Sequence, residues 1–123
     1  MNGLLLAALG GAFGAVARYG VGLWAVRAFG DALPYATFGV NILGGFAMGL
    51  LIGLVPLENR SAHILLGVGV LGGFTTFSSF AIECIEQWQR GARRRAALYA
   101  LGSLAGCATA AWVGFEILRR SWP

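Results

Sequence analysis

Four long apolar segments, separated by short polar ones, leave this chain little freedom in how it can fold. They cover about 4–26, 36–56, 62–88 and 96–118. A helix needs about 20 apolar residues to span the hydrocarbon of a bilayer, and each segment meets that length. Together they use nearly all of the 123 residues, so we expect no soluble domain beside them. The sequence predicts an all-α integral membrane protein with a single four-span domain over 1–123.

The composition agrees with a membrane protein and argues against several other classes. Hydrophobic residues make up 58% of the chain and charged residues only 11%, where a soluble domain carries roughly a quarter. The net charge of +4 comes from arginine, which mostly flanks the apolar segments and so suits interfacial anchoring rather than nucleic-acid binding. Cys84 and Cys107 lie in apolar segments and are expected to pack there. We find no nucleophile–base pair, metal cluster or phosphate loop, and do not expect an enzyme.

The loops and their charges bear on topology. Short connections place neighbouring helices antiparallel, so both termini should lie on one side. That side carries Arg60, Arg119 and Arg120, and the other carries Arg27, Arg90, Arg93, Arg94 and Arg95. Arginine counts set orientation, and this weak bias permits insertion both ways. Four tightly packed helices are also too few to enclose an aqueous pore, so we expect an oligomer. With the weak charge bias, this favours an antiparallel, dual-topology homodimer.

Small residues recur at four-residue spacing in three of the apolar segments, with Arg18 and Asn41 each taking one place in a row. Such rows let helix backbones approach closely. They account for much of the glycine content, which at 20 of 123 residues is far above the usual ~7%. We interpret them as helix-packing faces. The rows are Gly10, Gly14, Arg18 and Gly22; Asn41, Gly45, Gly49 and Gly53; and Gly102, Gly106, Ala110 and Gly114.

The third apolar segment contains the unusual stretch Gly72-Gly73-Phe74-Thr75-Thr76-Phe77-Ser78-Ser79-Phe80. Paired glycines weaken a helix, and the hydroxyl side chains after them compete for its hydrogen bonds. Backbone groups released in lipid must find protein partners or line a watery cavity. We therefore predict that the third helix is broken between Gly72 and Ser79 and that the break is a site.

A few other polar groups lie within the spans. Asn41 carries the only amide in the apolar part of a span, and an interhelical hydrogen bond and a functional role are about equally favoured. Tyr99 and Ser103 share one helical face with Cys107, a spacing that simple packing also explains. Arg18 can extend to the interface or pair with Glu83, the acid deepest in an apolar stretch.

Taken together, three groups of residues resemble the Fluc (CrcB) family of fluoride channels, and the resemblance covers all four spans. They are Arg18-Tyr19-Gly20, Thr37-Phe38-Gly39-Val40-Asn41 with Gly44-Gly45-Phe46, and the stretch from Gly72 to Phe80. The spacing Gly-Gly-x-x-Thr-Phe-Ser-x-Phe has no explanation in generic helix packing.

The resemblance implies a passive, fluoride-selective channel that exports cytoplasmic fluoride across a bacterial inner membrane. It implies an antiparallel dimer with two pores and a structural sodium ion held at the dimer centre by the backbone carbonyls of Gly72 and Thr75. Phe77 and Phe80 would form an aromatic box around fluoride. The polar residues implied along the pore are Asn41, Thr76, Ser79, Tyr99 and Ser103, with Cys107 where some members carry a further hydroxyl.

The physical chemistry of fluoride is compatible with this lining. Fluoride is strongly hydrated, so a pore must replace its water with neutral donors that also release it. The alternative function is a small dual-topology multidrug or cation exporter. That mechanism needs a carboxylate in the first span, and there is no Asp or Glu between Leu4 and Val26.

Overall fold

The computed structural model describes residues 2–30 and 33–119, and within these ranges every regular element is a helix. Four helical stretches of the described chain are long and apolar enough to cross a membrane, which confirms the predicted spans. The first, second and fourth spans are single helices, and the third is a series of shorter ones. The elements are α1 (Gly3–Phe29), α2 (Leu33–Leu54), α3 (Arg60–Ala62), η1 (His63–Leu71), α4 (Gly72–Phe74), α5 (Phe77–Gln89) and α6 (Arg93–Arg119).

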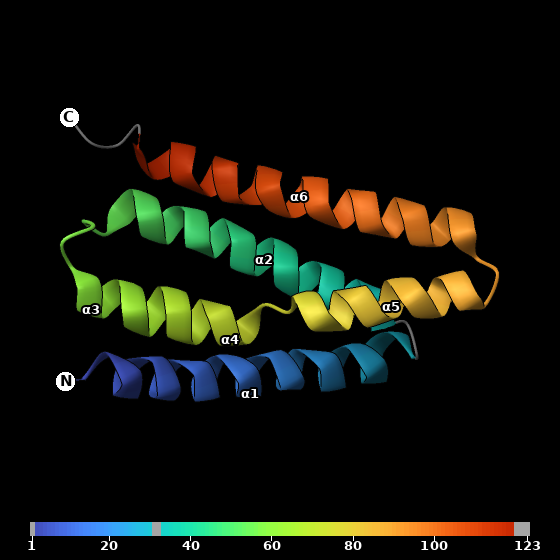
Figure 1. Cartoon of the computed structure of the whole chain (residues 1–123), viewed down its shortest axis with the longest axis horizontal. Helices are drawn as coiled ribbons and strands as arrows, with labels where there is room; N and C mark the ends of the chain where they lie inside the picture. The colour runs from blue at the N-terminus through green and yellow to red at the C-terminus, as the bar shows by residue number, and fades with distance from the viewer. Residues whose placement is uncertain (1, 31–32, 120–123) are drawn as a thin grey trace.

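The spans lie side by side along the long axis of the molecule, and α1 begins at the same end of the bundle at which α6 ends (Figure 1). This is the arrangement that short loops between antiparallel neighbours predict. Three boundaries differ from expectation by about one turn: α1 ends at Phe29 rather than near Val26, α2 begins at Leu33 rather than near Ala36, and α6 begins at Arg93 rather than near Ala96. The first turn of α6 therefore carries arginines that were expected in the loop.

Glycine brings α1 into backbone contact with the first half of the third span. A Cβ atom added to Gly10 would lie 2.9 Å from the Cα of Gly69, and one added to Gly73 would lie 2.5 Å from the carbonyl oxygen of Gly11. A Cβ on Gly14 would overlap the carbonyl oxygen of Val70. No larger residue fits at these positions unless the helices move apart.

A second glycine-mediated contact joins α2 to α6. A Cβ on Gly45 would lie 3.1 Å from the carbonyl oxygen of Cys107, and one on Gly49 would overlap that of Ala111. The packing role predicted for the rows is therefore confirmed at these positions. It does not extend to Gly22 and Gly102, whose added Cβ atoms would meet nothing within 4 Å in this chain.

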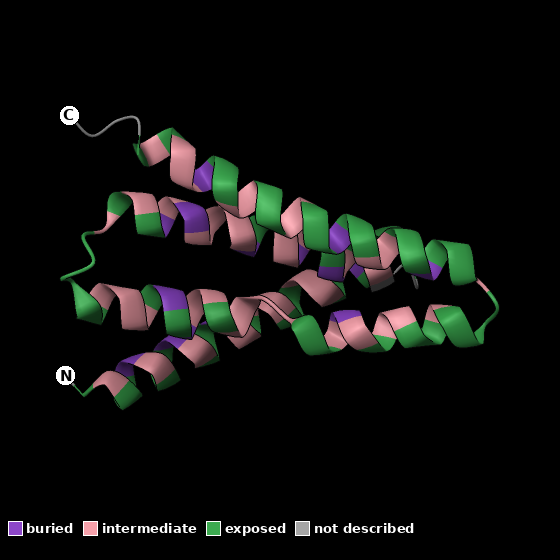
Figure 2. Ribbon diagram, turned by 45° about the horizontal axis from the view of Figure 1, so that its top comes forward, coloured by how far each residue is buried: buried purple, intermediate pink, exposed green. Residues whose placement is uncertain are grey.

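Much of the apolar surface is exposed in the single chain, and the buried residues are scattered along the inner faces of the helices (Figure 2). Exposed apolar side chains occur on all four spans. In a bilayer such surface faces lipid or another protein. The interior therefore consists mainly of glycine contacts between neighbouring helices, and the polar groups of the third span lie beside these contacts.

Candidate functional site

The third span is interrupted at two residues. Thr75 (φ −79°, ψ 157°) and Thr76 (φ −149°, ψ 113°) are extended, with helix on either side. The predicted interval from Gly72 to Ser79 contains this break but is too wide, because Gly72 and Gly73 are helical in α4 and Ser79 is helical in α5. Gly73 serves the close approach to α1 rather than the break itself, whereas an added Cβ on Gly72 would meet only the carbonyl oxygen of Gly67 in its own span.

Asn41 of α2 holds the break in place. Its Nδ2 donates to the carbonyl oxygen of Thr76 at 2.9 Å, and its Oδ1 accepts from the N–H of Thr76 at 2.8 Å. One amide therefore satisfies both backbone groups of a non-helical residue inside a span, as a lipid environment requires. An amide nitrogen carries two hydrogens, so one N–H of Asn41 is left for another acceptor.

Thr76 also starts the second half of the span. Its Oγ1 accepts from the N–H of Ser79 at 3.1 Å, which is the hydrogen bond of a helix N-cap. The same hydroxyl lies 3.1 Å from the Oγ of Ser79 and 3.3 Å from that of Ser78. Three hydroxyls thus gather at the first turn of α5, beside the break.

The break also releases backbone carbonyl groups. In a continuous helix the N–H of Thr76 would bond to the carbonyl of Gly72, and that of Ser79 to the carbonyl of Thr75. Here both N–H groups bond to side-chain oxygens instead. Of the neighbouring carbonyls, that of Gly73 accepts from Nε of Arg18 at 3.1 Å. The carbonyls of Gly72, Phe74 and Thr75 also lose their helical N–H partners, and the family resemblance assigns two of them, those of Gly72 and Thr75, to sodium.

A cavity of about 330 Å³ lies between α2, the break and α6. Among the residues lining it are Asn41, Thr76, Phe77, Phe80 and Ser103, with Cys107 beside them. None of the described residues that line it is charged. Five of the predicted pore residues therefore meet at one neutral cavity.

Ser103 is the most informative group in this cavity. Its side chain is only 5% exposed, and its hydroxyl has no hydrogen-bond partner among the described residues. A buried hydroxyl without a partner is unfavourable. Its hydrogen-bonding capacity is therefore not used by any described residue.

Two phenylalanines and a tyrosine form a continuous aromatic row beside the cavity. The ring centroids of Phe77 and Phe80 are 5.4 Å apart, and those of Phe80 and Tyr99 are also 5.4 Å apart. Phe80 is 7% exposed, whereas Phe77 is 70% exposed in the single chain. The row runs from the interior of the bundle to its surface.

Glu83 joins three spans. Its Oε1 accepts from the hydroxyl of Thr37 on α2, and its Oε2 accepts from the hydroxyl of Tyr99 on α6, both at 2.6 Å. The hydroxyl hydrogen of Tyr99, expected to face the pore, is thus used within the protein. Sequence reasoning missed Thr37, although it lies one helical turn before Asn41 and so on the same face of α2.

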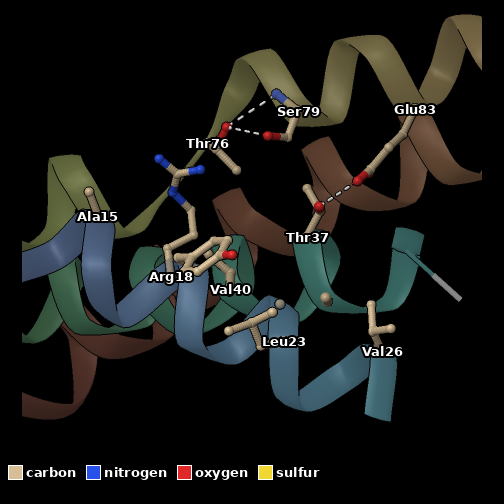
Figure 3. A pocket seen from close by; sticks show the side chains of 12 residues that line it. Ala15, Arg18, Leu23, Val26, Thr37, Val40, Thr76, Ser79 and Glu83 are labelled. Atoms are coloured by element: carbon tan, nitrogen blue, oxygen red, sulfur yellow. Dashed lines mark hydrogen bonds between the residues drawn. The ribbon is translucent and has the colours of Figure 1, made fainter. Parts of the chain in front are cut away.

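A second cavity, of about 510 Å³, opens beside Arg18 and Glu83 and is also lined by Thr37, Thr76 and Ser79 (Figure 3). The ion pair considered for Arg18 and Glu83 is not formed, since each bonds elsewhere. Both nevertheless line this one cavity. Across the described residues, no cluster of His, Cys, Asp or Glu could hold a metal through side chains.

Comparison with known proteins adds an independent line of evidence. The family model described as "CrcB-like protein, Camphor Resistance (CrcB)" matches residues 5–115. A relative from Phenylobacterium zucineum (strain HLK1), named Fluoride-specific ion channel FluC, is 47% identical over 124 residues, which is 98% of each chain. A protein of that name from Caulobacter vibrioides (strain NA1000 / CB15N) is also 47% identical, with 98% of each chain covered. One from Agrobacterium fabrum (strain C58 / ATCC 33970) is 42% identical over 122 residues, covering 97% of this chain and 98% of the relative. The chain belongs to the CrcB-like family.

Proposed function

We propose that this protein is a passive, fluoride-selective channel of the bacterial inner membrane. The observation that carries the proposal is the neutral cavity beside the break, where phenyl rings, an amide N–H and an unpartnered serine hydroxyl meet. The relatives named as fluoride-specific ion channels support it across almost the whole chain. An ion channel needs no catalytic groups, and the protein is not an enzyme.

The lining suits the smallest halide. Fluoride gives up its hydration water only to strong replacement donors, which the second N–H of Asn41 and the hydroxyl of Ser103 can supply. The positive edge of a phenyl ring adds weaker stabilisation, and Phe77 and Phe80 line the same cavity. A full charge here would hold the ion too firmly, because conduction needs sites that also release it.

The route would follow α6 and the first turn of α5. Tyr99 and Ser103 lie one helical turn apart, with the ring of Phe80 against Tyr99. Thr76 lines both the neutral cavity and the larger cavity that holds Arg18, and so stands between them. Arg18 lies away from the neutral cavity, where its charge can raise the local fluoride concentration without trapping the ion.

The working assembly in this proposal is an antiparallel homodimer with two pores. The freed carbonyls of Gly72 and Thr75 fit a hard cation such as sodium, which prefers oxygen ligands. One chain offers two such oxygens, and a second copy would bring two more. The exposed Gly72 and Phe77 would then be covered by the partner.

The direction of transport follows from simple electrostatics. Hydrogen fluoride crosses bilayers as a neutral acid and releases fluoride in a neutral cytoplasm. A membrane potential that is negative inside then drives the anion out through a passive pore, at about 2.3 kcal/mol per 100 mV.

An efflux assay tests the function. Liposomes that contain the purified protein are loaded with fluoride or chloride, and release of each anion is followed after a membrane potential is applied. We expect rapid fluoride release and almost no chloride release. Equal release of the two anions, or none of either, would refute the proposal.

A matched pair of variants ties the flux to the site. Phe80→Ile should strongly reduce fluoride release, whereas Phe13→Ile changes a ring on the exposed face of α1 and should leave release unchanged. Equal release from both variants would remove Phe80 from the pore. For topology, a reporter fused after Pro123 should appear on both faces of the membrane, and a signal on one face only would contradict dual topology.

A further inference from the structure

A third cavity, of about 650 Å³, lies where the start of α2, the end of α5 and the start of α6 come together (Figure 1). It is lined by Pro34 and Tyr35 from α2, Gln87 from α5, and Arg94, Arg95 and Leu98 from α6, among others. These residues lie at the ends of the spans. The cavity therefore sits at the boundary between the hydrocarbon and the headgroup layer.

The electrostatics of this cavity favour an anion. Arg94 and Arg95 contribute two positive charges, and none of the described residues that line the cavity is acidic. Two helices, α2 and α6, begin here, and neither has an acidic residue in its first turn. The positive ends of both helix dipoles thus add to the arginines. Asp31, which precedes α2 in the sequence, lies outside the described residues.

The neighbouring arginine differs in its contacts. The guanidinium carbon of Arg93 lies over the ring of Trp88, 5.1 Å from its centroid. Arg94 and Arg95 are both exposed and line the cavity instead. The first turn of α6 therefore has one arginine held by an aromatic ring and two directed to the cavity.

Gln87 supplies an independent observation. Both its Nε2 and its Oε1 are buried, and neither has a hydrogen-bond partner among the described residues. Buried amides are rarely left unpaired. A ligand oxygen beside this side chain would give the N–H groups the acceptor that they lack.

The remaining walls decide between a soluble anion and a lipid. Pro34, Phe38, Ala92 and Leu98 give the cavity an extensive apolar surface, which a small hydrated anion would not use. A phospholipid would use both parts, placing its phosphate at the arginines and its glycerol and upper acyl carbons on the apolar wall. Basic pockets between transmembrane helices bind anionic headgroups in this way.

We propose that this cavity is a binding site for the phosphate headgroup of an anionic phospholipid. Arg94, Arg95 and the amide of Gln87 contact the phosphate, and Phe38 and Leu98 contact the apolar part. The cavity is distinct from the neutral cavity, and the two share no lining residue, but Tyr99, which lies on the proposed fluoride route, also lines it. Lipid binding is measured directly, so its test does not depend on whether the channel conducts.

Native mass spectrometry of the purified protein, titrated with phosphatidylglycerol, tests the site. Removing one arginine that contacts the lipid headgroup should weaken the affinity for the lipid about fivefold. The variant with Arg94→Gln and Arg95→Gln should therefore bind the first lipid about 30-fold more weakly. Gln87→Leu keeps the size but removes the amide, and should weaken binding about tenfold.

The matched control removes the same number of charges elsewhere, through Arg27→Gln and Arg60→Gln, neither of which lines the cavity. It should change the affinity by less than about twofold, because neither arginine contacts the lipid in this proposal and solvent-exposed charges without contact are screened. An equal loss in the control and the cavity variant would overturn the proposal. Glycerol phosphate, which has the headgroup chemistry without acyl chains, separates a lipid site from a soluble-anion site. If it binds as tightly as phosphatidylglycerol, the lipid assignment is wrong.

Discussion

Replacing Ser103 by alanine should separate stability from function in this protein. The hydroxyl is buried and makes no hydrogen bond within the described chain, so the folded protein gains nothing from it. Its desolvation costs about 1–3 kcal/mol, and alanine is also a better helix former by a few tenths of a kcal/mol. Ser103→Ala should therefore raise the free energy of unfolding by about 1–2 kcal/mol, allowing for water in the cavity.

Fluoride flux should change in the opposite direction. A hydrogen bond to a charged group is worth about 1.5–3 kcal/mol. If the hydroxyl donates to the ion at its highest barrier, its loss slows flux by about 10- to 100-fold. Because the expected change in unfolding free energy and the expected change in fluoride flux have opposite signs, one variant tests the role of Ser103 in stability and in conduction.

The measurements are unfolding in mixed detergent micelles and fluoride release from liposomes, each against wild type. Thr109→Val is the control, because Thr109 is exposed on the same helix and does not line the cavity. It should leave flux unchanged. A Ser103→Ala variant that is less stable than wild type would show that the hydroxyl has an internal partner, and normal flux would show that the ion does not meet it.

Three further predictions follow from the hydrogen bonds and the packing. Asn41→Ala leaves the N–H and the carbonyl of Thr76 unpaired and should lower the free energy of unfolding by about 2 kcal/mol or more. Asn59→Ala removes only an exposed helix cap and should cost at most about 1 kcal/mol; equal losses would show that Asn41 does not hold the break in place. Gly14→Ala pushes a methyl group onto the backbone of η1 and should destabilise the protein by about 1–3 kcal/mol, while Gly22→Ala, in open space, should not; similar melting temperatures would contradict the packing. Thr37→Val and Tyr99→Phe should each cost about 1.5–3 kcal/mol in wild type but only a few tenths in a Glu83→Leu background, and additive losses would show that Glu83 does not couple them.

The fold was predictable because the bilayer imposes strong constraints on a sequence. Apolar length gives the number of spans, and short loops give their alternation, which is how the structure arranges them. The weakly predicted part was the exact position of the break. Propensity pointed to Gly72 and Gly73, but both residues are helical, and α1 packs against Gly73, with Gly11 close to it. Such a tertiary contact leaves no signature in local propensity.

The proximity of several site residues was predictable, but their bonding was not. Asn41, Thr76, Phe80 and Ser103 line one cavity, whereas the predicted pore residues Ser79 and Tyr99 do not line it. Spacing could not show that Asn41 bonds to the backbone of Thr76, nor that Tyr99 bonds to Glu83. These pairs join different spans, and a helical pattern reports only what lies on its own face.

The glycine contacts also bear on how the chain is made. The closest approaches pair α1 with the third span and α2 with α6, so they join the first segment to the third and the second to the fourth. As spans leave the ribosome in order, the first two have no glycine partner until later ones arrive. Nascent α1 therefore lacks its glycine-packed neighbour through the synthesis of a whole further span, and the four-helix arrangement can close only after the third span is made.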